Sequence, residues 1–366
     1  IGPHGGPPSV VSLTLKKIAD GSETRIALPA NPRFGFPEWS PDGKHFAITN
    51  TTTGGIELWV GETASAKLRP LKVGRVNDLL GDPVRWMPDN RTLAVHLVPA
   101  GRGKAPETAA APKGPNVQEG SGRAGPVRTF QDMMKTPTDE ALFDYYATSQ
   151  LALVDTADGK VTPVGRPAIF QGASPSPDGK HLLVTRVGRP YSYLHPVFAF
   201  PKEVEVWDRA GKVVHKLASL PLADQVPIEG VPTGPRGYHW RPTEPATLVW
   251  IEALDGGDPK RKVPHRDRVL MSKAPFDRPA VELVKTEHRL QGGFGGGRFG
   301  GGGGPLQWIE NSEFVFVRDY DRDRRWERTV LVNAENPAQA PRQVWSLSAQ
   351  DRYKDPGNAL YRVLPT

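Results

Sequence analysis

The sequence WSPDGKHFAIT, residues 39–49, carries the signal that decides the fold. An aromatic residue ends one strand, Pro-Asp-Gly forms a turn, and an apolar stretch continues as a second strand, which together predict a β-hairpin. The phrase recurs as WMPDNRTLAV from Trp86, PSPDGKHLLVT from Pro175, WRPTEPATLVW from Trp240 and, more weakly, WIENSEFVFV from Trp308. A hairpin that recurs along the whole chain indicates a repeat architecture.

A second phrase follows most of these hairpins and predicts a third strand, a polar turn and the start of a fourth strand. Its copies are IELWVGETASAK from Ile56, LALVDTADGK from Leu151, VEVWDRAGK from Val204, DRVLMSKAPFD from Asp267 and TVLVNAENPAQ from Thr329. SLTLKKIADGSETRIAL, from Ser12, is the same phrase without a hairpin before it. We therefore expect the chain to open in the middle of a blade.

The spacing of the hairpins favours a propeller. Their first residues lie 47 to 89 positions apart, and a bare four-stranded blade needs about 40–50 residues. We predict an all-β chain that is a partial β-propeller over residues 1–366, with about five four-stranded antiparallel blades. A doubly wound α/β fold would need helices between its strands, and the short turns leave no room for them.

Three stretches interrupt this pattern. The longest, residues 99–148, is expected to be an insertion between two strands of one blade, with a helix near residues 137–146 because Pro137 follows Thr136 and acids fill the first turn. Residues 187–202 form a second insertion in the equivalent connection of the next blade. Both should emerge on one face, which we expect to be the partner-facing one. Residues 292–304 are a Gly-rich loop.

Composition leaves several classes of function open. The net charge of +7 and the pI of about 9.5 fit a basic solvated surface, an acidic substrate or a nucleic acid. Basic and acidic residues are interspersed, which favours the first two and argues against nucleic acid. No run of apolar residues is long enough to span a membrane, and the first residues have no signal-peptide pattern, so we expect no membrane partner and an export signal already removed. Cysteine is absent.

No catalytic, metal or cofactor motif is complete. The chain has no G-x-S-x-G, so it lacks the elbow that exposes a nucleophilic serine in α/β-hydrolases, and we expect it to be inactive by itself. Asp319, Asp321 and Asp323 begin like a calcium loop, but Arg324 and Val330 stand where glycine and glutamate are required. The Gly-rich loop matches a dinucleotide motif only trivially, since it neither follows a strand nor opens a helix. We therefore predict no metal and no cofactor.

The best candidates for substrate binding lie in TRVGRPYSYLHP, residues 185–196, and in TGPRGYHW, residues 233–240. Arginine offers a planar fork that matches a carboxylate, and neighbouring tyrosines can order it. The alternative is that the aromatic residues pack the insertion onto its blade while the arginines are surface charges. The candidate residues are Arg186, Arg189, Tyr191, Tyr193, His195 and Arg236.

Several long phrases make the chain similar to one known family. TDEALFDYYATSQLALVD from Thr138, SPSPDGKHLLVTRVGRPYSYLHP from Ser174, ATLVWIEALDGGDPK from Ala246 and DRYKDPG from Asp351 resemble the propeller of glutamyl endopeptidases, which are serine peptidases of the prolyl oligopeptidase family. The resemblance runs from about Ser12 to the end of the chain. The Gly-rich loop departs from it.

The resemblance implies a propeller of about seven blades beside an α/β-hydrolase domain that is absent from this chain. The propeller would gate and select peptide substrates, acidic ones in particular, for cleavage after glutamate. The alternative is a stand-alone TolB-like propeller that binds proteins or peptides. A downstream coding sequence containing G-x-S-x-G would decide for the enzyme. For location we favour a periplasmic or secreted bacterial protein, with the chloroplast stroma as the alternative that the family suggests.

Overall fold

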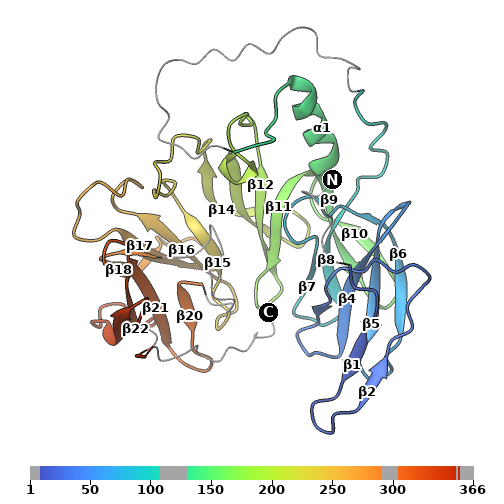
Figure 1. Ribbon diagram of the computed structural model, residues 1–366, viewed down its shortest axis with the longest axis horizontal. Coiled ribbons are helices and arrows are strands. Elements are labelled where there is room, and N and C mark those ends of the chain that lie inside the picture. Colours follow the sequence, from blue (N-terminus) through green and yellow to red (C-terminus); the bar gives the residue numbers. More distant parts are fainter. Residues whose placement is uncertain (1–8, 108–129, 291–303, 352, 355–366) are drawn as a thin grey trace. The chain divides into compact units, whose positions relative to one another are not determined.

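The computed structural model describes residues 9–107, 130–290, 304–351, 353 and 354. These residues form two compact units, the first containing strands β1–β14 with both helices and the second containing β15–β23 (Figure 1). The Gly-rich loop of residues 292–304 lies outside the described residues except for Gly304.

The strands of the first unit are short and follow one another in chain order. They are β1 (Thr14–Lys16), β2 (Glu23–Arg25), β3 (Glu38–Trp39), β4 (His45–Thr52), β5 (Gly55–Glu62), β6 (Leu68–Val76), β7 (Val84–Trp86), β8 (Thr92–Leu97), β9 (Thr148–Asp155), β10 (Val161–Pro163), β11 (Ala168–Pro175), β12 (His181–Val187), β13 (Lys202–Asp208) and β14 (Val213–Leu220). Two helices, α1 (Pro137–Ala147) and the 3-10 turn η1 (Val197–Ala199), complete it.

The second unit contains β15 (Arg236–Trp240), β16 (Thr247–Ala253), β17 (Asp267–Lys273), β18 (Val281–Thr286), β19 (Arg289–Leu290), β20 (Leu306–Trp308), β21 (Phe314–Asp321), β22 (Trp326–Asn333) and β23 (Arg342–Ser348). Every strand pair within both units is antiparallel.

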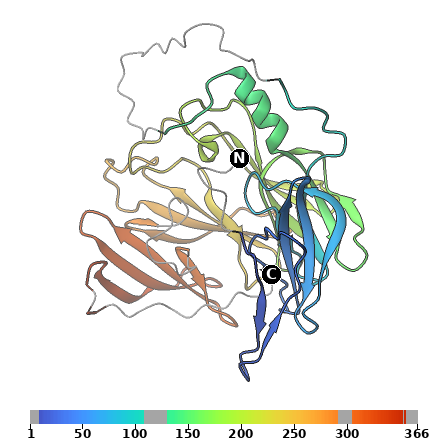
Figure 2. The ribbon, with the colours of Figure 1, turned by 45° about the vertical axis from the view of Figure 1, so that its right-hand side comes forward.

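Consecutive strands pair in sets of four. The sets are β3–β6, β7–β10, β11–β14, β15–β18 and β20–β23, and Figure 2 shows β4, β5 and β6 side by side. This all-β, four-stranded arrangement confirms the predicted β-propeller class. In the first unit the sets also join at their edges, where Val76 pairs with Leu97 and Ile169 with Thr148. The number of blades stays a prediction.

The repeated phrase forms the same turn wherever it is best preserved. Ser40 Oγ donates to Asp42 Oδ1 (2.8 Å), and His45 N donates to Ser40 Oγ (2.9 Å). Ser176 makes the equivalent bonds to Asp178 (2.6 Å) and from His181 (3.0 Å). In both copies the following glycine has φ of +67°, a conformation that glycine adopts without strain. These bonds position the start of each second strand.

The alternation of buried side chains along the strands builds separate apolar layers. Leu58, Val60, Leu93, Val95 and Val154 belong to one layer of the first unit. In the second unit a comparable layer is lined by residues of β16, β17, β18, β21 and β22, namely Val249, Ile251, Val269, Met271, Leu283, Val284, Val315, Val317 and Val332. Burial of these apolar residues is what stabilises sheets that have only short strands.

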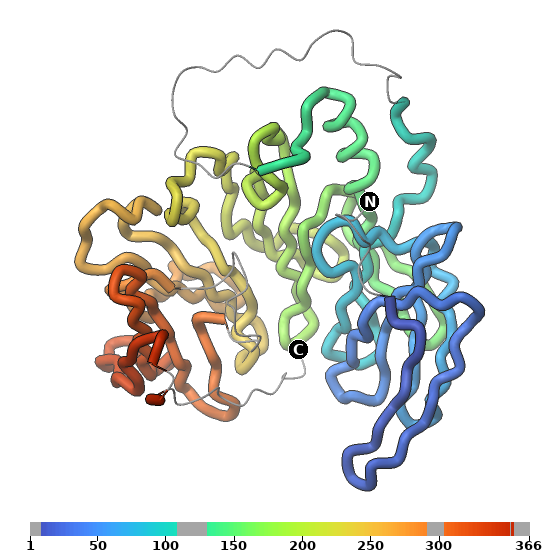
Figure 3. The backbone as a smooth tube through the Cα atoms, viewed as in Figure 1, coloured from blue at the N-terminus to red at the C-terminus, as the bar shows by residue number. Residues whose placement is uncertain are grey.

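Helix α1 forms where the sequence predicted it. Asp139 N donates to Thr136 Oγ1 (3.2 Å), and Thr136 N donates to Asp139 Oδ2 (2.8 Å), so the two residues form a capping box just before Pro137. The helix and its flanking chain connect β8 to β9, the second and third strands of one set. The second insertion connects β12 to β13 in the next set, and its path can be followed in Figure 3.

One buried histidine couples the first unit to pH. His96 on β8 is 3% exposed, its ring stacks on Phe170 (centroids 5.6 Å apart), and burial lowers its pKa to about 4. The unfolded chain would take up this proton near pH 6.5, whereas the folded chain resists it until about pH 4. The contribution of the neutral, buried His96 ring to the free energy of unfolding is therefore fully present above pH 6.5 and is lost as the pH falls from 6.5 to 4.

We expect His96→Leu to remove this acid sensitivity. The wild-type free energy of unfolding should fall by about 2 kcal/mol more than that of the variant between pH 6.5 and pH 4. Urea unfolding of both proteins at several pH values measures the difference. Parallel stability curves for the two proteins would show that the histidine does not titrate with folding.

Candidate functional site

The two insertions of the first unit pack into one structure. The Phe143 ring of α1 meets Tyr191 and Phe200 of the second insertion edge-on, with centroids 5.0 and 5.8 Å away, and Tyr191 stacks on Phe200 at 5.1 Å. Ala147, Ile169 and Val187 are buried in the same cluster. The insertions predicted separately from the sequence therefore share a small apolar core of their own.

Ion pairs reinforce this contact. Arg189 binds two carboxylates one helical turn apart on α1, Glu140 and Asp144, and its guanidinium carbon lies 4.6 Å from the Tyr191 ring centroid. The Tyr191 hydroxyl donates to Asp144. Burial, together with Asp144, raises the pKa of the Tyr191 hydroxyl, so it stays protonated as a donor. Arg189 and Tyr191 thus fasten α1 to the second insertion.

The other candidates of this segment have different surroundings. Arg186 forms a bidentate ion pair with the buried Glu205 (2.9 Å), which also accepts from Trp207 Nε1 (2.8 Å). Tyr193 remains partly exposed, and its pKa is raised by burial and by a bond to Glu140. His195 is buried, and its backbone N donates to Ser192 Oγ (3.0 Å). The structure brings Arg189, Tyr191 and Tyr193 together around the acids of α1.

Arg236 lies in the second unit, in a buried network of charges. Its side chain is 10% exposed, and Nη2 lies 2.5 Å from Oδ2 of the fully buried Asp267. Arg289 Nη1 binds Asp267 Oδ1 (2.6 Å), and its Nη2 binds the second fully buried carboxylate, Asp255. Arg266 also binds Asp255 (2.9 Å).

This network contains three guanidinium groups and two carboxylates. Each carboxylate also accepts a hydrogen bond from a backbone N–H group: Leu290 N donates to Asp267 (2.7 Å) and Gly257 N to Asp255 (2.9 Å). Although burial alone would raise the pKa of Asp255, its bond to Arg289 lowers it. The Arg236 Nη1 group is buried without a hydrogen-bond acceptor in the described part of the chain. The network therefore carries a net positive charge with spare donor capacity.

Sequence reasoning did not identify Asp255, Asp267, Arg266 or Arg289. Asp267 was assigned only to a strand, although a carboxylate at the start of an otherwise apolar strand, one residue after an arginine, is a signal for a buried ion pair. Their partners come from separate connections, so no local spacing links them.

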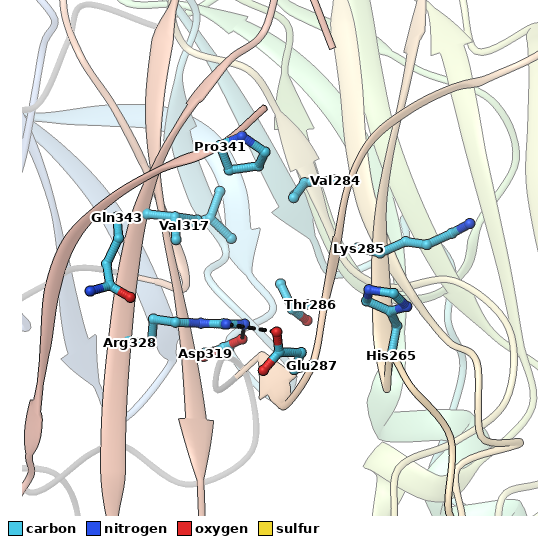
Figure 4. A pocket seen from close by; sticks show the side chains of 11 residues that line it. His265, Val284, Lys285, Thr286, Glu287, Val317, Asp319, Arg328, Pro341 and Gln343 are labelled. Atoms are coloured by element: carbon cyan, nitrogen blue, oxygen red, sulfur yellow. Dashed lines mark hydrogen bonds and ion pairs between the residues drawn. The ribbon is translucent and has the colours of Figure 1, made fainter. Parts of the chain in front are cut away.

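The second unit also has a pocket of about 270 Å³ between β18 and strands β21–β23. Figure 4 shows Arg328 pointing at Glu287 across the pocket, with Asp319 beside it; the two ion pairs measure 3.0 and 2.7 Å. His265 and Lys285 line the other side, and Val284 and Val317 form part of the apolar wall. None of the six predicted residues lines this pocket.

The calcium-like run has an ordinary structural role. Asp319 pairs with Arg328, and Asp321 accepts from the backbone N of Asp323 (3.1 Å) in the turn between β21 and β22. Among the described residues, no three His, Asp or Glu side chains are placed to hold a metal ion. The helices that the structure describes are too short or too polar to cross a membrane.

The comparisons with known proteins agree with the resemblance seen in the sequence. No family model matches the chain. It is 36% identical over 346 residues to a probable chloroplastic glutamyl endopeptidase of Oryza sativa subsp. japonica, which covers 91% of this chain and 35% of the relative. The protein of the same description from Arabidopsis thaliana is also 36% identical over 346 residues, covering 92% of this chain and 34% of the relative.

Solved structures with a related fold include several peptidases. Pyrococcus horikoshii acylaminoacyl peptidase matches with a TM-score of 0.46 and 12% identity over 91% of this chain and 41% of that one. The propeller domain of the Pyrococcus furiosus Trilobed protease gives 0.42 and 11% over 87% and 71%. TolB from Acinetobacter baumannii gives 0.38 and 10% over 90% and 59%. Such similarities do not bear on function.

The fold is a β-propeller, and over nine-tenths of its length the chain is similar in sequence to two probable glutamyl endopeptidases. The chain spans about a third of the length of these relatives. Both relatives are named chloroplastic, and neither is named as a periplasmic or secreted protein.

Asp267→Ala should destabilise the second unit by about 3–5 kcal/mol, because it leaves buried guanidinium groups without a counter-charge. Glu252→Gln is the matched control, since Glu252 pairs with Arg268 on the surface of the same sheet and should cost less than about 1 kcal/mol. Chemical denaturation followed by tryptophan fluorescence measures both. Equal small losses would mean that the network does not contribute to folding.

Proposed function

We propose that this chain is the non-catalytic propeller part of a serine endopeptidase, where it gates and selects peptide substrates for cleavage after glutamate by a hydrolase domain. The similarity to two glutamyl endopeptidases over nine-tenths of the chain carries the proposal. The absence of G-x-S-x-G supports the assignment of the nucleophile to another domain. A chloroplast location for the whole protein is proposed on the same ground.

The joined insertions support a gating role. Loops of a propeller can restrict entry to a neighbouring site only if they hold their shape, and here α1 and the second insertion share aromatic contacts and two ion pairs. We assign Arg189 and Tyr191 to positioning these loops, because both bind carboxylates of α1, and Arg186 to holding β12 against β13 through Glu205. Tyr193 and His195 remain proposed substrate-facing residues of the same loop.

Arg236 is the proposed partner of the substrate glutamate. A carboxylate that leaves water needs a cationic or hydrogen-bonding partner, or its transfer costs several kcal/mol. The surplus positive charge around Arg236 supports such a partner. The stand-alone binding module, the alternative to this function, requires no cleavage and no substrate glutamate.

Arg236→Ala in the full-length protein should lower kcat/KM for a glutamyl substrate tenfold or more, equivalent to about 1.4 kcal/mol, with a much smaller loss on the matched glutaminyl substrate. Asp267 keeps Arg289 as a partner, so the variant should fold. Arg189→Ala should instead lower kcat/KM equally for both substrates, as expected for a positioning residue. No loss for Arg236→Ala would place glutamate recognition elsewhere.

A fluorophosphonate probe separates the enzyme from the binding module. Residues 1–366 should show no labelling and no peptidase activity, whereas the full-length protein should be labelled at one serine. Stoichiometric labelling of residues 1–366 would contradict the proposal. A full-length protein that is not labelled would favour the binding module.

A further inference from the structure

Arg102, at the start of the first insertion, is held against the end of α1 by aromatic rings. Its guanidinium carbon lies 4.4 Å from the Tyr145 ring centroid and 5.7 Å from that of Tyr146, and these two rings meet edge-on at 5.0 Å. Arg102 Nη1 donates to the Tyr145 carbonyl (3.4 Å), and the Tyr145 hydroxyl donates to the Gly103 carbonyl (2.9 Å). The Arg102 side chain is therefore fixed by the stacking on Tyr145 and by the hydrogen bonds between these two segments of the chain.

Arg102 differs in charge balance from the arginines described above. Arg186, Arg189 and Arg236 each form an ion pair with a carboxylate, whereas Arg102 has none among the described residues. The nearby acids of α1 are already used, since Glu140 and Asp144 bind Arg189. A guanidinium that stacks by its face keeps the N–H groups of its edge directed outward. Within the described part of the chain, Arg102 is thus an ordered cation without a counter-charge.

We propose that Arg102, supported by Tyr145, binds a carboxylate group of an acidic peptide. The planar edge of a stacked guanidinium matches the two oxygens of a carboxylate, and its pre-ordering reduces the entropy lost on binding. The inference rests on the proposed selection of acidic peptides and adds a second contact to it.

Fluorescence anisotropy of residues 1–366 with labelled peptides tests this. Three peptides of one length are compared: one with two glutamates and an amidated end, its glutamine counterpart with an amidated end, and the glutamine counterpart with a free terminal carboxylate. Arg102→Gln should weaken binding of the first peptide tenfold or more, equal to about 1.4 kcal/mol. Lys104→Gln is the matched control, because it removes one exposed positive charge two residues away and should change Kd less than twofold.

A second pair of variants tests the stacking. Tyr145→Phe keeps the ring face and should retain most of the affinity, whereas Tyr145→Leu should weaken binding about as much as Arg102→Gln although the arginine is present. Thermal unfolding of each variant confirms that it is folded.

The outcomes separate this inference from the proposed function. If the wild type prefers the glutamate peptide and Arg102→Gln binds it equally well, acidic selection stands and the assignment of Arg102 is overturned. If the wild type binds glutamate and glutamine peptides alike, acidic selection by this chain fails, and the inference with it. Tight binding of only the peptide with a free end, lost in Arg102→Gln, supports the site and identifies its ligand as a terminal carboxylate.

Discussion

The short turn between the first and second strands of a set is the constraint on which most of this fold depends. In four of the five sets this turn contains a residue with a left-handed backbone, a conformation that costs most side chains energy. The turn between β15 and β16 has none among its described residues. Gly43 and Gly179 adopt this conformation without strain, and asparagine takes the place at Asn90 and Asn311, with φ of 59° and 55°. Asn90 also accepts a bond from the backbone N of Asp42 (2.8 Å), so one turn supports its neighbour.

Outside these turns, ion pairs made by arginine side chains hold several of the connections in place. A composition with a net charge of +7 suggests excess cations on the surface, but many of the arginines form ion pairs within the chain. Paired charges that are buried cost much when one partner is removed and contribute little net stability while intact. Here the ion pairs mainly fix the positions of connections that have few apolar residues.

The sequence was sufficient to predict the strands, but it was not sufficient to predict which charged side chains form ion pairs. The Pro-Asp-Gly turns and the alternation of apolar residues predicted the sets of strands, and Thr136, Pro137 and Asp139 predicted α1, because these signals are local. The partners of Arg189 and Arg236 come from residues 45 or 49 and 31 positions away, which no spacing rule reveals. Asp255 and Arg289 are 34 positions apart and were missed for the same reason. Arg102 was missed because Tyr145, on which it stacks, lies 43 positions away across a long insertion.

The tight turns and the insertions occupy opposite ends of each antiparallel set. The connections between first and second strands are short, and four of the five contain a left-handed residue, whereas the connections from β8 to β9 and from β12 to β13 are long and contain α1 and η1. Each set is therefore modular at one end only. Foreign loops grafted between second and third strands should be accepted by the scaffold, and a graft at the other end would disturb the register of every strand that follows.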